Sequence, residues 1–125
     1  MLETLREMQA RVNGLPHLNR LGRLFSCTVL LKIDDAEFYL TFEKGQLTSL
    51  FEGPSRKTPW QFSLTLDANA LQKFWEPHPA PGFHDIFGLV KIGRATVEGD
   101  ILLLVKNLRF FKEFMALARQ MEQTT

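Results

Sequence analysis

Apolar and polar residues alternate through most of residues 24–66, and this period of two constrains the fold more than any other feature of the sequence. Side chains of a β-strand point to alternate faces, whereas those of a helix recur every 3.6 residues. The pattern predicts four strands: 24–33, 37–43, 47–51 and 60–66. Turn-forming residues separate them: Asp34-Asp35, Lys44-Gly45 and Gly53-Pro54. The segment is therefore predicted to form a meander of antiparallel strands.

Helical patterns flank these strands on both sides. Apolar residues at spacings of three and four predict five helices: 2–12, 16–21, 68–75, 83–91 and 101–121. Asp67 and Asp100 stand at expected N-caps, and residues 94–98 predict a fifth strand at an edge of the sheet. This order predicts an α+β fold, with helices packed on one face of an antiparallel five-stranded sheet. The length suits a single domain, 1–125.

Composition limits the class of protein. The chain has 15 basic and 14 acidic residues, so its bulk charge predicts neither a nucleic-acid partner nor an anionic membrane. Cys27 is the single cysteine, which rules out an internal disulfide and predicts a reducing, cytoplasmic location. The longest apolar run, 101–105, is too short for a transmembrane helix, and the first residues lack the apolar region of a signal peptide.

The helix expected at 101–121 is more apolar than contact with one sheet requires. On a helical wheel, one arc of about half the circumference holds its main apolar residues: Leu103, Leu104, Leu108, Phe110, Phe111, Phe114, Met115, Leu117, Ala118 and Met121. A helix lying on a sheet needs a stripe of roughly 100°. The surplus, centred on Phe110, Phe114 and Leu117, predicts a further partner: the N-terminal helix, a bound apolar molecule or a second subunit.

The second half of the chain resembles a known family. Residues 62–67 end a strand, 68–75 and 85–90 form two short helices, and Val97-Glu98-Gly99-Asp100 leads directly into an apolar helix. This arrangement resembles the sterol carrier protein 2 domain, and the resemblance extends to the strands at 24–66. It implies a five-stranded sheet whose helices enclose an apolar tunnel. Members bind fatty acids, acyl-coenzyme A, sterols or other lipids, some act as accessory domains to lipid or isoprenoid-quinone enzymes, and the family shares no catalytic residues.

The expected function is therefore a lipid-binding domain that is not an enzyme and carries no cofactor or metal. An apolar cavity between sheet and helices would hold a fatty acid, acyl-coenzyme A, sterol or isoprenoid-like molecule. Seven residues are predicted to line it: Phe83, Phe87, Leu89, Phe110, Phe114, Met115 and Leu117. The alternative is a non-catalytic accessory or dimerisation module that uses the C-terminal helix as an interface with a second copy or an enzyme partner.

Three polar features leave other interpretations open. His78, His84 and Asp85 lie in or beside the proline-rich segment 76–84, which replaces a shorter connection in the family, and they could ligate a metal. The favoured interpretation is that His84 or Asp85 caps the next helix while His78 is solvated. Cys27 is interpreted as a small buried hydrophobe. A cation could meet a lipid head group at the mouth of the cavity, with four candidates: Arg94, Lys106, Arg109 and Lys112.

Overall fold

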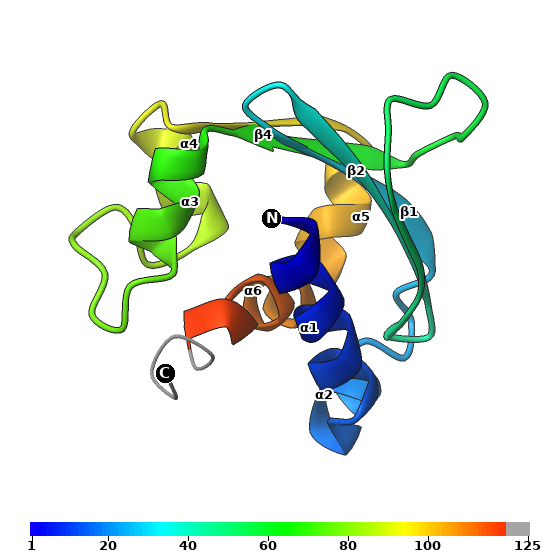
Figure 1. Ribbon diagram of the computed structural model, residues 1–125. Helices are drawn as coiled ribbons and strands as arrows, with labels where there is room; N and C mark the ends of the chain where they lie inside the picture. The colour runs from blue at the N-terminus through cyan, green and yellow to red at the C-terminus, as the bar shows by residue number, and fades with distance from the viewer. Residues whose placement is uncertain (120–125) are drawn as a thin grey trace.

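The computed structural model describes residues 1–119 (Figure 1). Its helices are α1 (Leu2–Asn13), α2 (Pro16–Leu21), α3 (Ala68–Phe74), α4 (Ile86–Lys91), α5 (Ile101–Lys106) and α6 (Leu108–Met115). Its strands are β1 (Cys27–Ile33), β2 (Ala36–Glu43), β3 (Gln46–Glu52), β4 (Phe62–Leu66) and β5 (Ala95–Gly99). All five predicted strands are present, and the predicted α+β fold is confirmed.

The five strands form one sheet in the order β3-β2-β1-β4-β5. β1, β2 and β3 form the expected antiparallel meander, and β5 pairs antiparallel with β4 at the far edge. The prediction of a wholly antiparallel sheet is wrong at one place, because β4 lies parallel to β1. The alternation of apolar and polar residues shows which residues of a strand share a face, but it does not show which other strand pairs with it. Residues 53–61 are long enough to carry the chain back past β2 to the free edge of β1.

The helices gather on one face of the curved sheet (Figure 1). The inner faces of the central strands contribute to the core there, with Val29 and Leu31 of β1, Leu40 of β2 and Leu64 of β4 all buried. The opposite face is partly covered by the connection between β3 and β4, in which the carbonyl of Ser55 accepts a 2.8 Å hydrogen bond from the Tyr39 hydroxyl. Helices on one face agree with the sequence prediction.

Helix α1 protects the outer edge of β3. The side chain of Asn13 accepts a 2.7 Å hydrogen bond from the amide of Leu47, and Gln9 donates to the Leu47 carbonyl at 2.9 Å. An unpaired strand edge is otherwise a template for further pairing. Asn13 and Gln9 therefore satisfy the backbone N–H and C=O of Leu47, which have no partner strand on this side of β3.

The helix expected at 101–121 is broken into α5 and α6, a turn at Ala116 separates α6 from a further helical stretch at 117–119, and residues 120–121 lie outside the described part of the chain. The break falls at Asn107, with φ −119° and ψ 24°. Its side-chain amide donates to the carbonyl of Leu103 at 3.1 Å. Asparagine competes with the helix for backbone hydrogen bonds, which explains why the helix ends there. The two helices consequently need not present one continuous face.

Candidate functional site

Aromatic rings from α6 fill the space between that helix and the sheet. Six phenylalanines, each at most 1% exposed, form this aromatic cluster: Phe25, Phe42, Phe62, Phe110, Phe111 and Phe114. Phe42 of β2 meets Phe114 edge to face at 5.1 Å between ring centroids, and Phe62 of β4 meets Phe111 at 5.4 Å. Such geometry adds about 0.5–1.5 kcal/mol per pair beyond area burial. The centre of the domain is thus apolar and filled by these rings.

Phe110 is held tightly by the backbone around it. A Cβ built on Gly22 would lie 2.6 Å from the Phe110 ring and 2.8 Å from the Cα of Gly45. Phe110 also packs against Phe25 at 5.3 Å and Phe42 at 5.8 Å. The end of α2 and the β2–β3 turn therefore approach this ring more closely than any side chain at position 22 allows.

The seven residues predicted to line a cavity are distributed over several places. Phe110 and Phe114 enter the aromatic cluster, and Leu89 and Met115 are fully buried. Leu117 instead borders a surface recess of about 270 Å³. The structure brings the α6 members of the prediction together on the inner side of the sheet, and their role in binding stays a prediction.

The other two predicted residues, both half-buried, lie around α4. Phe87 borders a second recess, of about 230 Å³, together with Leu108 and Lys112. Phe83 lies under two cations, with Lys73 at 5.4 Å and Arg94 at 5.7 Å from the ring centroid. Phe83 therefore has a cation–π environment that sequence spacing did not reveal.

The three apolar side chains that exceed the needs of a sheet contact, Phe110, Phe114 and Leu117, are buried within the domain. Phe110 is 1% exposed, Phe114 0% and Leu117 5%. The sheet covers the two phenylalanines, and Leu15 and Leu18 lie beside Leu117 in the recess. These three residues are therefore not exposed for a contact with another subunit, and the use of the C-terminal helix as an interface stays a prediction.

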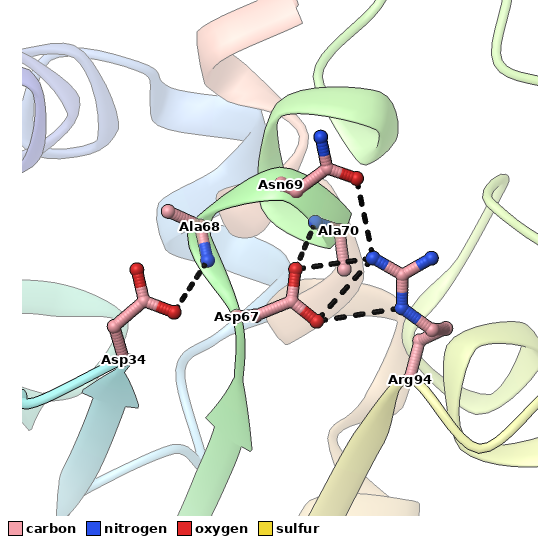
Figure 2. Close-up of polar contacts among 6 residues, drawn as sticks. All are labelled: Asp34, Asp67, Ala68, Asn69, Ala70 and Arg94. Carbon is pink, nitrogen blue, oxygen red and sulfur yellow. Dashed lines mark hydrogen bonds and ion pairs between the residues drawn. The ribbon is translucent and has the colours of Figure 1, made fainter.

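Arg94 is engaged by acidic and amide groups at the start of α3 (Figure 2). Its guanidinium lies 3.1 Å from Oδ1 of Asp67 and donates to Asn69 at 3.3 Å. Asp67 also accepts from the amide of Ala70 at 2.7 Å, which confirms it as the N-cap of α3. The hydrogen bonds from Arg94, followed by that from Ala70, lower the pKa of the Asp67 carboxyl. Arg94 therefore ties β5 to α3 and does not present a free charge for a head group.

Arg119 holds the proline-rich connection between α3 and α4. Its guanidinium donates to the carbonyl of Phe74 and, at 2.8 Å, to that of His84. It also lies 4.4 Å from the centroid of the Phe74 ring, and burial lowers its pKa. On the helical wheel Arg119 is one of several polar-face cations, so residue spacing does not predict this contact.

The metal hypothesis receives no support from the side-chain arrangement. Asp85 caps α4 by accepting from Gly88 at 2.7 Å, as the favoured interpretation allowed, while His78 and His84 are exposed. Within residues 1–119, no three histidine, cysteine or acidic side chains are arranged to hold a metal ion.

Cys27 is buried at the start of β1. Burial, with a further contribution from the charge of Asp100, raises the pKa of its thiol to about 12. This shift favours the protonated thiol over the thiolate, which is the nucleophilic form. This agrees with its interpretation as a small hydrophobe.

Structural comparison identifies the architecture as that of a sterol carrier protein 2-like domain. The crystal structure of sterol carrier protein 2 superposes with a TM-score of 0.74 at 12% identity, covering 94% of each chain. A conserved hypothetical protein from Thermus thermophilus gives 0.73 at 12% identity, over 94% of this chain and 85% of the other. A UbiJ-SCP2 ubiquinone synthesis protein gives 0.60 at 18% identity, over 90% and 85%. No protein-family model and no curated protein matches the sequence.

Among the helices of residues 1–119, none is both long and apolar enough to span a membrane.

Proposed function

We propose that this chain is a lipid-binding domain that holds one apolar molecule between the sheet and α6. The observation that carries the proposal is the aromatic cluster, which lies on the inner face of a sterol carrier protein 2-like sheet. A fatty acid, acyl-coenzyme A, sterol or isoprenoid-like molecule suits such a lining. Binding would come from burial, at about 0.8 kcal/mol for each CH₂ removed from water.

A ligand must displace rings that now fill this space. The contacts between α6 and the sheet are van der Waals contacts, which have no fixed direction and can re-form after a shift. The polar anchors lie at the other end of the helix, where Trp75 donates to the Met115 carbonyl at 2.8 Å and Arg119 holds the α3–α4 connection. We therefore infer that the start of α6, with Phe110, moves while its end, with Phe114 and Met115, stays fixed.

The direct test is lipid analysis. Protein purified without detergent is extracted and its lipids identified by mass spectrometry, and a fluorescent fatty acid is then displaced from the delipidated protein by unlabelled fatty acid. The proposal predicts stoichiometric lipid or saturable, displaceable probe binding. Phe114→Ala, which enlarges the site, should change the preferred chain length, whereas Leu102→Ala on exposed α5 should not. Absence of both copurified lipid and saturable probe binding in folded protein contradicts the proposal.

We further propose that the domain presents its ligand and does not transform it. The carboxylates of Asp67, Asp85 and Asp100 cap α3, α4 and α5, and the Cys27 thiol is buried with a raised pKa. A role beside a lipid or isoprenoid-quinone enzyme is supported by the structural similarity to the UbiJ-SCP2 ubiquinone synthesis protein. Incubation with an acyl-coenzyme A should leave the thioester intact by mass spectrometry, and release of free coenzyme A above a protein-free control contradicts this role.

A further inference from the structure

Three surface recesses border helix α6, and they differ in what separates each of them from the aromatic cluster. The recess of about 270 Å³ lies beside Glu113 and Leu117, at the end of the helix. This end is anchored, because Trp75 donates a buried 2.8 Å hydrogen bond to the Met115 carbonyl. A ligand that entered there would have to displace the anchored end and leave buried polar groups without partners, which is costly.

Backbone closes the recess of about 280 Å³ between α2 and the start of α6. Leu21 and Arg109, which line it, directly precede Gly22 and Phe110 in the chain. A Cβ on Gly22 would lie 2.6 Å from the Phe110 ring, and the Gly22 carbonyl accepts a 2.7 Å hydrogen bond from the Phe25 amide. Backbone held in this way cannot rotate aside as a side chain can, so this flank of α6 is closed.

Side chains close the recess of about 230 Å³ between α4 and the start of α6. Its apolar wall consists of Phe87 of α4 and Leu108 of α6, both half-buried and packed against the core. The backbone of α6 approaches that of α2 over more residues than that of α4. This flank of α6 is therefore the more loosely packed of the two, and half-buried side chains stand between the recess and the interior.

Rotation of these two side chains leads directly to the aromatic cluster. Side chains that border open space change rotamer within picoseconds to nanoseconds, and the recess provides that space. Leu108 and Phe111 are three residues apart and therefore share a face of α6. Phe111 meets Phe62 of β4 at 5.4 Å between ring centroids. A chain that passes between Phe87 and Leu108 consequently arrives at the rings that line the proposed binding space.

Charged groups of both signs form the rim of the recess between α4 and α6. Lys91 of α4 and Lys112 of α6 are exposed, and the half-buried carboxylate of Asp85 accepts a 2.7 Å hydrogen bond from the amide of Gly88. An apolar wall with a few polar groups at its edge orients a ligand that has one polar end. The rim therefore suits the head group of an amphiphile without selecting the sign of its charge.

We propose that the recess between α4 and α6 is the entrance through which a ligand reaches the interior, and that Phe87 and Leu108 form its gate. The inference rests on the proposed lipid binding and names the ligand as a flexible single-chain amphiphile. An acyl or isoprenoid chain can pass between two rotating side chains one segment at a time. A fused ring system needs the whole opening at once, so a sterol enters more slowly.

Stopped-flow fluorescence with cis-parinaric acid, a fluorescent fatty acid, tests the gate. Phe87→Ala and Leu108→Ala should each raise both the association and the dissociation rate about fivefold and leave Kd within about twofold, because a gate residue changes the barrier and not the bound state. Leu15→Ala and Leu21→Ala are matched controls, since these half-buried leucines border the other two recesses and should leave both rates unchanged. Phe87→Leu and Leu108→Val, which keep most of the packing, repeat the test if an alanine variant unfolds.

The ligand class is tested with dehydroergosterol, a fluorescent sterol, which should associate at least about tenfold more slowly than the acyl probe. Equally fast association of the sterol contradicts this class.

Three further results overturn the gate. The first is saturable probe binding whose rates Phe87→Ala and Leu108→Ala leave unchanged, and the second is equal acceleration by the Leu15→Ala control. The third is a change in Kd without faster association, because it assigns Phe87 and Leu108 to the lining of the site. Each of these results leaves lipid binding itself in place. Absence of saturable binding to the folded, unsubstituted protein contradicts the lipid-binding proposal, and the entrance with it.

Discussion

Helices α5 and α6 are neighbours of similar apolar character with opposite environments. α6 buries Phe110, Phe111 and Phe114 against the sheet, whereas α5 leaves Leu102 and Val105 half exposed or more. One asparagine separates them. Apolar composition along a helix therefore does not tell whether a residue belongs to the core. The position of the sheet and the break at Asn107 decide it.

The largest expected effect comes from truncating a ring of the aromatic cluster. Phe111→Ala should lower the free energy of unfolding by about 3–5 kcal/mol, because it removes contacts with Phe62 and Phe114 and leaves a cavity. Leu102→Ala should change it by less than about 0.5 kcal/mol. Urea unfolding followed by circular dichroism measures both. Similar losses for the two variants would break the distinction between the helices.

A methyl group at position 22 tests how closely the backbone approaches α6. Gly22→Ala should destabilise by about 1–3 kcal/mol, because the Cα of Gly45 leaves no room and backbone cannot rotate away as a side chain can. Gly14→Ala is the control, since its nearest neighbour would be 3.5 Å away. The same unfolding assay applies. An unaffected Gly22→Ala would show that both the Phe110 ring and the turn at Gly45 can move aside at little cost.

The fold was predictable from the sequence where periodicity and caps act locally. Alternation identified the strands, and Asp67 and Asp100 were confirmed as N-caps, because a cap depends on residues three positions away. The parallel pairing of β1 with β4 was missed, since strand direction depends on the path of residues 53–61 and not on alternation.

The candidate site was less predictable than the fold. A helical wheel assumes an unbroken helix, so the angular positions that it assigns to residues on opposite sides of the break at Asn107 are not comparable. The wheel placed Leu102 and Val105 correctly among polar residues, in agreement with their exposure. Contacts of Phe25 with α6 and of Arg119 with the α3–α4 connection join segments far apart in sequence, for which local spacing carries no signal.

A smaller effect is expected at the polar link between α3 and β5. Asp67→Ala should cost about 1 kcal/mol through loss of the N-cap, and Asp67→Asn should cost less because asparagine also caps. The lowered pKa of Asp67 means that its charge stabilises the fold above about pH 3.9 and that this contribution is lost as pH falls through the folded-state value. Asp67→Asn should remove this part of the acid sensitivity. Unchanged acid unfolding would show that Arg94 contributes nothing.

The smallest effect is expected at the boundary of the two helices. Asn107→Ala should change stability by less than about 0.5 kcal/mol, because loss of the hydrogen bond to Leu103 is offset by the higher helix propensity of alanine. Carbon chemical shifts of residues 105–109 would show whether the break persists. A continuous helix is expected, because Asn107 ends α5, and a break that persists in the variant would contradict this assignment.

We expect the space between α6 and the sheet to admit an apolar ligand. Methyl-labelled methionine provides the most direct measurement, because Met115 and Met8 are fully buried in the core and Met1 is exposed. Titration of the delipidated protein with oleate should shift the Met115 signal saturably at one equivalent and leave Met1 in place. A Met115 signal that does not respond while oleate remains soluble and the protein folded would contradict the claim.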